Sequence, residues 1–186
     1  MRVTKEPEER RQEIIDTAMR LFYEKGYEKT SIADIAKAIG VAQGLCYRYF
    51  PSKEALFDCT VDQYAQILAG RLTPPEENLK RPLKEILEQM PMDAETDDSM
   101  YYRVFHEADN KKFHDQLSLK VCEKLVPGVT VLLERARKNG ELDIDDVETA
   151  ARFCVYGQLG ILLDGKLSAE EKAGRIRKFL IYALRV

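Results

Sequence analysis

Apolar residues recur at three- and four-residue intervals along almost the whole of this 186-residue chain. That spacing places them on one side of an α-helix, whereas a half-buried strand would alternate apolar and polar residues. We find no convincing strand pattern in the sequence. Capping residues and helix stops such as Gly40 and Pro51 then delimit helices over 8–25, 32–39, 43–50 and 52–72. The pattern therefore predicts an all-α fold.

Beyond Thr73-Pro74-Pro75 the same spacing predicts helices over 80–90, 99–108, 112–125, 127–139, 145–163 and 168–184. Pro127 fits either the first turn of a separate helix or a kink in one continuous helix, and both alternatives stay open. Ser168 and Glu171 form a capping-box pattern that opens the final helix.

Composition argues against several classes of protein. No apolar run approaches the roughly 20 residues of a membrane helix, and the N-terminus lacks the apolar segment of a secretory signal. The four cysteines lie far apart without a Cys-x-x-Cys pair, and only two histidines are present. We therefore expect a cytoplasmic protein with reduced cysteines, without a metal site, a cofactor or a membrane partner.

Charge is distributed unevenly along the chain. Residues 1–53 contain 10 Lys and Arg against 8 Asp and Glu, a net charge of +2, whereas the remainder carries −5. A weakly basic head on an acidic body fits local contact with a polyanion.

The two short helices joined by Gly40-Val41-Ala42 have the size and spacing of a helix-turn-helix. On a helical wheel Cys46 and Phe50 share one face, which we expect to pack on the first two helices. The opposite face and its flanks suit a major groove, with bases approached by the outer face and phosphates by the phenols. The residues of this helix expected to contact DNA are Gln43, Gly44, Leu45, Tyr47, Arg48 and Tyr49.

Lys53 is a separate indication of an anionic partner. A lysine in the first turn of a helix opposes the helix dipole, which is unfavourable unless lysine and helix terminus together hold a phosphate. Thr30 and Ser31, at the start of the second helix, are expected to donate to phosphate in the same way.

The segment 30–57 resembles the DNA-binding signature of the TetR family of transcriptional regulators. Five parts of the signature occur together and in order: the threonine start, the Ile35-Ala36 pair, the Gly40-Val41 turn, Tyr47-Arg48-Tyr49-Phe50 and Ser52-Lys53-Glu54-Ala55-Leu56. The resemblance covers about the first third of the chain. Leu45 stands where the family commonly has threonine and Cys46 where a larger aliphatic residue is common, so Leu45 offers an apolar contact such as a thymine methyl.

The resemblance implies a homodimeric, ligand-responsive regulator, more often a repressor than an activator. We expect a helix-turn-helix DNA-binding domain over 1–51 and a helical ligand-binding and dimerisation domain over 52–186. Its partners would be a near-palindromic double-stranded DNA operator, a small-molecule effector and a second copy of the chain. A pocket for the effector is expected among Met90, Tyr101, Tyr102, Phe105, His106, Phe153 and Tyr156.

The apolar surfaces of the last two predicted helices also favour a dimer. Residues 153–163 are apolar nearly all round, so a second copy is expected to cover the face that the chain's own core leaves open. The final helix adds an apolar stripe, and together the two helices predict a four-helix interface about a two-fold axis. The expected interface residues are Cys154, Gly157, Gln158, Ile161, Ile176, Phe179, Leu180 and Ala183.

Two other classes of function have less support from the sequence. An enzyme has little support, because the sequence offers no nucleophile–base pairing, Gly-rich phosphate loop or metal constellation. A protein-interaction adaptor would use the three-helix head on a protein partner, and DNA binding at low and moderate salt separates it from a regulator.

Overall fold

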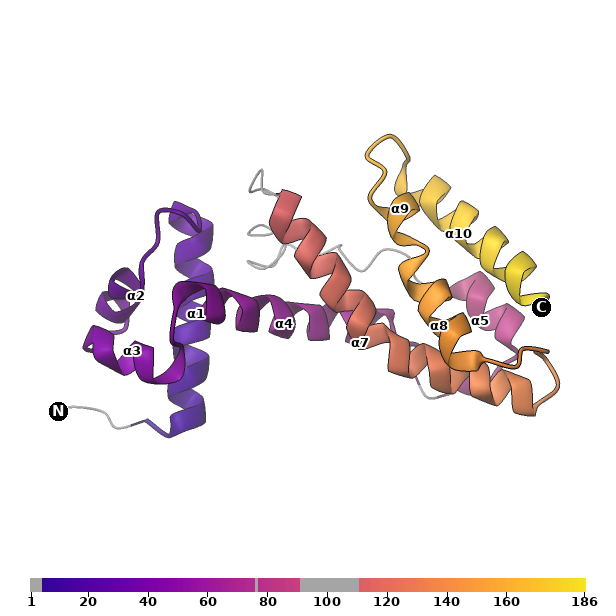
Figure 1. Ribbon diagram of the computed structural model, residues 1–186, viewed down its shortest axis with the longest axis horizontal. Helices are drawn as coiled ribbons and strands as arrows, with labels where there is room; N and C mark the ends of the chain where they lie inside the picture. Colours follow the sequence, from indigo (N-terminus) through magenta and orange to yellow (C-terminus); the bar gives the residue numbers. More distant parts are fainter. Residues whose placement is uncertain (1–4, 76, 91–110) are drawn as a thin grey trace. The chain divides into compact units, whose positions relative to one another are not determined.

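The computed structural model describes residues 5–75, 77–90 and 111–186, with the backbone alone for 111–114. Every regular element in this part of the chain is helical, as the spacing predicts, and the helix expected over 99–108 lies outside it. No helix among the described residues has the length and apolar character needed to cross a bilayer. The elements are α1 Pro7–Lys25, α2 Ile32–Ala38, α3 Gln43–Tyr49, α4 Lys53–Leu72, η1 Asn78–Lys80, α5 Leu83–Gln89, α7 Lys111–Lys138, α8 Val147–Tyr156, α9 Leu159–Leu162 and α10 Ala169–Leu184 (Figure 1).

The described residues divide into two compact units. The first contains 5–64 and 111–117, and the second contains 65–75, 77–90 and 118–186. The first unit thus includes the opening turns of α4, whose residues Leu56, Phe57, Val61 and Tyr64 are buried. The functional boundary expected after residue 51 stays a prediction.

In the first unit, α2 contacts both α1 and α3 (Figure 1). The apolar stripe of α1 supplies Ile14, Ala18 and Phe22 to its core, and α2 supplies Ile35, which is fully buried. The predicted cap of α2 is present as a capping box, in which the Ser31 side chain accepts from the backbone N–H of Asp34 and the Asp34 carboxylate accepts from that of Ser31.

Gly40 fixes the turn between α2 and α3. Its φ of +72° lies in the left-handed region that favours glycine. The N–H of Val41 donates to the carbonyl of Ala36 at 2.9 Å and that of Gly40 to the carbonyl of Lys37 at 3.2 Å. This is the Schellman arrangement, which ends α2 and releases the chain for α3 within two residues.

In the second unit, α5 is held at both ends. The first N–H of α5, at Leu83, donates to the Glu141 carboxylate at 2.6 Å, and the Arg135 guanidinium on α7 donates to the carbonyl of Arg81 at 2.7 Å. Beyond the other end, Arg177 on α10 donates to the carbonyl of Met90 at 2.8 Å. An anion at the N-terminus and a cation near the C-terminus both complement the helix dipole, which stabilises this seven-residue helix.

Glu141 makes the stability of the second unit dependent on pH. The hydrogen bond from Leu83 lowers the pKa of the Glu141 carboxyl; burial opposes that shift, while Asn139 and Arg135 add to it. A lowered pKa means that the stabilisation is complete above the unfolded value near pH 4.3 and is lost as the pH falls through the folded value. We expect Glu141→Gln to lower the free energy of unfolding by about 1 kcal/mol at pH 7. Urea unfolding should show this loss shrinking below about pH 4, and Glu88→Gln, an exposed change on α5, is the control.

Three elements differ in extent from their sequence patterns, and the first is α5, which begins at Leu83 and not at residue 80. α7 is one helix with Pro127 inside it, which settles the open alternative at that proline. Pro127 and Glu123, the residue whose carbonyl loses its helical donor, are both exposed, so water can satisfy that carbonyl. The single helix expected over 145–163 is wrong, because α8 ends at Tyr156 and α9 begins at Leu159.

The break between α8 and α9 centres on Gly157. A Cβ atom at this position would lie 2.5 Å from the carbonyl oxygen of Phe153, so the backbone approach requires glycine. The Gln158 side chain donates to the carbonyl of Cys154, which compensates for the interrupted helical pattern.

Candidate DNA-binding interface

Helix α3 has one buried and one exposed face. Cys46 is completely buried, as is nearly all of Phe50, which directly follows the helix. Gln43, Gly44, Tyr47 and Arg48 are exposed, whereas Leu45 and Tyr49 are half-buried. The predicted orientation of the helix is therefore confirmed, while the predicted DNA contacts of these residues stay predictions.

The exposed face is open at its first turn. A Cβ built on Gly44 meets no atom within 4 Å, and 47% of the neighbouring Tyr47 side chain is exposed. A glycine in a helix costs stability relative to alanine, and no contact inside the protein requires one here. The absence of a side chain at Gly44 leaves room for a surface that approaches α3 closely.

Cys46 anchors α3 to the rest of the first unit. Burial raises the pKa of its thiol, so the neutral form is favoured. This environment supports the packing interpretation of Cys46 and gives no support to a reactive thiolate on the outer face.

The expectation for Thr30 is wrong. Its side chain is 1% exposed, and its hydroxyl lies 2.9 Å from the carbonyl oxygen of Gly26 and 3.2 Å from that of Leu21. A hydroxyl has one proton to donate, and here carbonyls at the end of α1 receive it. Thr30 therefore fixes the connection between α1 and α2 and is not placed to reach a phosphate.

Ser31 is exposed, but its hydroxyl is engaged. Ser31 Oγ donates to the Asp34 carboxylate at 2.6 Å, and these contacts lower the pKa of that carboxyl. A phosphate would have to replace Asp34 as the acceptor, so the phosphate contact predicted for Ser31 requires this bond to open.

Lys53 begins α4 and is half-buried. Its ammonium donates to the carbonyl of Tyr27 at 3.1 Å and lies 4.1 Å from the centre of the Tyr27 ring. Ser52 caps the same helix end by accepting from the backbone N–H of Ala55 at 3.1 Å. The structure thus places a fixed cation at the start of α4, beside the segment that follows α3.

Arg11 is a residue of this region that the sequence pattern did not single out. Its guanidinium lies 5.3 Å from the centre of the Phe50 ring and donates to the Cys59 sulfur at 2.8 Å. It therefore ties α1 to the end of α3 and to α4. The two partners lie 39 and 48 positions away in sequence, so no local spacing could have revealed these contacts.

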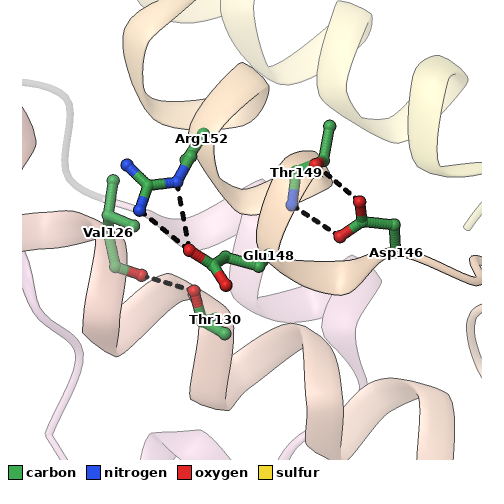
Figure 2. A network of polar contacts seen from close by, with 6 residues as sticks. All are labelled: Val126, Thr130, Asp146, Glu148, Thr149 and Arg152. Carbon is green, nitrogen blue, oxygen red and sulfur yellow. Dashed lines mark hydrogen bonds and ion pairs between the residues drawn. The ribbon is translucent and has the colours of Figure 1, made fainter.

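In the second unit, the exposed side of α8 changes character along its length. Its first turns carry a polar network, in which Asp146 accepts from both the backbone and the hydroxyl of Thr149, and Arg152 pairs with Glu148 at 2.8 Å (Figure 2). The next residue, Phe153, is 75% exposed. The exposed side of α8 is therefore polar at its start and carries an aromatic ring in its second half.

The predicted dimer residues fall into two groups. Phe179 is 63% exposed, and Gly157 and Ala183 are also exposed, whereas Cys154, Gln158 and Ile161 are half-buried. Ile176 and Leu180 are 1% and 4% exposed because they belong to the core of their own unit, so little of either residue is left for a second copy to cover. Tyr182, 80% exposed and absent from the prediction, lies three residues after Phe179 on the exposed side of α10.

The predicted effector pocket is only partly covered by the described residues. Tyr101, Tyr102, Phe105 and His106 lie outside them. Met90 packs against the larger core of the second unit and Tyr156 against a small cluster formed by Cys122, Val126 and Val155. Phe153 is exposed, so the described residues do not enclose it, and its contact with an effector stays a prediction.

Comparison with known proteins finds similarity to bacterial regulators. Residues 14–59 match the family model described as bacterial regulatory proteins, tetR family. The probable HTH-type transcriptional regulator ArpR of Pseudomonas putida is 29% identical over 164 residues, which cover 81% of this chain and 77% of ArpR. The solved structure of Salmonella enterica GusR has a TM-score of 0.66 and 26% identity, covering 98% of each chain.

A further relative matches nearly all of this chain, but the match covers less than two thirds of that relative's own length. The uncharacterized HTH-type transcriptional regulator YerO of Bacillus subtilis is 27% identical over 197 residues, which cover 95% of this chain but 63% of YerO. The similarity therefore extends past the helix-turn-helix into the second unit, although it leaves about a third of that relative unmatched.

Proposed function

We propose that this chain is a DNA-binding regulator of the TetR family rather than an enzyme, and specifically a cytoplasmic, dimeric repressor that a small-molecule effector releases from a near-palindromic operator. The match of residues 14–59 to the tetR family model and the similarity of the fold to solved regulators support this proposal. The observation that carries the proposal is the orientation of α3. Cys46 and Phe50 lie on its buried side. Gly44, Arg48 and the half-exposed Tyr47 lie on its outer side, where a partner can reach them.

In the proposed complex, α3 enters the major groove. Gln43, Gly44, Leu45 and Arg48 approach base edges, and Tyr47 and Tyr49 reach phosphates on either side. Lys53 and the start of α4 hold a further phosphate. Thr30 has no part in this interface, and Ser31 contributes only if its bond to Asp34 opens.

The proposed dimer uses the exposed apolar surfaces of α8 and α10. Phe153, Phe179 and Tyr182 are 75%, 63% and 80% exposed, and burial of such aromatic side chains against a partner would stabilise an association. A two-fold interface between copies would cover it, with Gly157 permitting close approach. The two DNA-binding heads would then lie one helical turn of DNA apart, roughly 34–36 Å.

Release by an effector is proposed as a shift of population. An effector that binds better to dimers whose heads do not match successive major grooves would lower the occupancy of the operator. Helix α4 begins with Lys53 in the first unit and ends in the second, so it is the element we propose to transmit the change.

Binding to random duplex DNA at low and moderate salt tests the function most simply. A regulator should bind, and log affinity should fall steeply and linearly with log salt concentration, because binding to phosphates releases counterions. Selection of bound duplexes from a random pool should then yield a near-palindrome, and metabolites can be screened for release of that site. Absence of duplex binding at low salt would favour the protein-interaction adaptor.

The phosphate contacts predict a uniform loss of affinity. Lys53→Ala should weaken binding to all duplex sequences by about tenfold at low salt and reduce the salt slope by about 1. Tyr49→Phe should also weaken binding across sequences and flatten the salt dependence, through loss of its phosphate hydrogen bond. Fluorescence anisotropy at several salt concentrations measures both, with Lys84→Ala on α5 as the matched control. Parental affinity and slope in either variant would refute that contact.

A further inference from the structure

Tyr27 lies in the connection between α1 and α2, and three aromatic rings meet there. Its ring centre is 5.2 Å from that of Phe22 on α1 and 4.9 Å from that of Phe57 on α4. Phe22 and Phe57 are themselves in edge contact at 5.8 Å. Tilted and edge-on rings at these separations attract one another, so the Tyr27 ring is held in one place by two helices.

The phenol of Tyr27 adds a second tie to α4. It is hydrogen-bonded to the Glu54 side chain, in the first turn of the helix. Burial, followed by the nearby carboxylates, raises the pKa of Tyr27, so the phenol remains a neutral donor. The ring is therefore anchored on one side by apolar contacts and at its edge by a hydrogen bond.

Lys53 lies against this anchored ring. Its ammonium is 4.1 Å from the ring centre and donates one of its three N–H groups to the Tyr27 carbonyl at 3.1 Å. A cation at this distance is attracted by the ring quadrupole, and the carbonyl adds a directed bond. Both contacts come from one residue, and they offset the unfavourable position of a lysine at the positive end of a helix dipole.

A free lysine side chain loses rotamer freedom when it binds a phosphate, and that loss weakens binding. A lysine that is already held in place in the unbound protein has lost that freedom before DNA arrives. The remaining N–H groups of Lys53 retain their capacity to donate.

We propose that Tyr27 is a positioning residue for DNA binding, which holds the Lys53 ammonium at the start of α4 ready for a phosphate. This inference rests on the proposed function and names a residue that the helix-turn-helix pattern leaves out. Tyr27 acts through Lys53 and does not itself touch DNA. Its ring is the essential part, and its hydroxyl is secondary.

A double-mutant cycle separates this role from simple stabilisation of the fold. Tyr27→Leu and Tyr27→Phe are each made in the parent and in Lys53→Ala, and binding to a random-sequence 30-base-pair duplex is measured at several salt concentrations. We expect Tyr27→Leu to weaken binding about three- to tenfold and to lower the salt slope toward that of Lys53→Ala. Tyr27→Phe keeps the ring and should bind within about twofold of the parent. In the Lys53→Ala background, Tyr27→Leu should cause no further loss.

An equal loss from Tyr27→Leu in both backgrounds would overturn the proposal, as would an equal loss from Tyr27→Phe and Tyr27→Leu in the parent. Parental binding by Lys53→Ala would overturn it together with the phosphate contact, whereas failure of the parent to bind any duplex would overturn the proposed function itself. A measurement without DNA covers the case in which Tyr27→Leu folds poorly. The Lys53 ε-methylene protons of the parent should resonate upfield of a solvated lysine because of the ring current, and a random-coil shift would contradict the proposal.

Discussion

Phe153→Asp is expected to convert the dimer into monomers at micromolar concentration. In the proposed dimer, the two-fold axis would place the substitution in the interface twice, so each dimer would lose two aromatic contacts and gain two charges that must be desolvated. Truncation of an aromatic residue at an interface typically costs about 2–4 kcal/mol of binding free energy. The cost counts twice in a two-fold dimer, so we expect the dissociation constant of the dimer to rise roughly 1,000-fold or more. Sedimentation velocity over a range of concentrations measures this directly. Operator affinity should fall with it, because a monomer reads only one half-site.

The monomer itself should remain folded, since Phe153 is 75% exposed and contributes little to the core of its unit. Leu119→Asp on α7 is the matched control, because it also places a carboxylate at an exposed apolar position, 52% exposed, outside the proposed interface. A Phe153→Asp protein that sediments as the parent does would show that α8 does not form the dimer.

Gly44→Glu is expected to abolish DNA binding without harm to the fold. A Cβ at Gly44 meets nothing within 4 Å, and replacement of glycine in the first turn of a helix by a carboxylate-bearing residue favours the helix. In the groove, the same side chain would collide with base edges and repel the phosphates. We expect a loss of more than 100-fold in affinity for the selected operator, equivalent to about 3 kcal/mol, with an unchanged or slightly raised melting temperature.

Gly70→Glu provides a control with an identical change of charge. Gly70 also lies exposed on a helix with nothing within 4 Å of its added Cβ, but it belongs to the second unit. It should bind the operator within about twofold of the parent at moderate salt, where remote charges are screened. Gly44→Ala should give an intermediate loss that reports the steric part alone. Equal binding by Gly44→Glu and Gly70→Glu would exclude the first turn of α3 from the interface.

The sequence predicts the helices well where local chemistry sets their ends. Capping and stop residues affect only neighbouring positions, and here they are Ser31, Asp34, Gly40, Pro51 and Ser168. The helices next to these residues begin and end within about two residues of the prediction. The buried and exposed sides of α3 could also be predicted, because Cys46 and Phe50 are four positions apart and must share a face.

Two features that the sequence did not predict depend on where nearby backbone carbonyls lie in the folded chain. The Thr30 hydroxyl has the residue type of a phosphate ligand, and only the position of the α1 carbonyls shows that it is consumed internally. A glycine such as Gly157 is compatible with a continuous helix, and only the close approach of the Phe153 carbonyl shows why the helix ends here.

Helix α10 shows the same limit for packing. Its apolar arc includes both Ile176 and Phe179, and a wheel alone cannot tell which side of a wide arc meets the core. In the structure Ile176, Leu180 and Leu184 take the core side, which leaves Phe179 and Tyr182 in solvent. The division of an apolar surface between a core and a partner is therefore a tertiary property.

In the proposed complex, the outer face of α3 lies against duplex DNA. Site-specific photocross-linking tests it most directly, with a photoreactive residue placed at Gly44 on the exposed first turn of α3 and, in a second protein, at Tyr182 on α10. We predict efficient cross-links from position 44 to bases within each operator half-site and none from position 182. Operator binding without any cross-link from position 44 would contradict the claim, because the bound DNA would then lie against another surface.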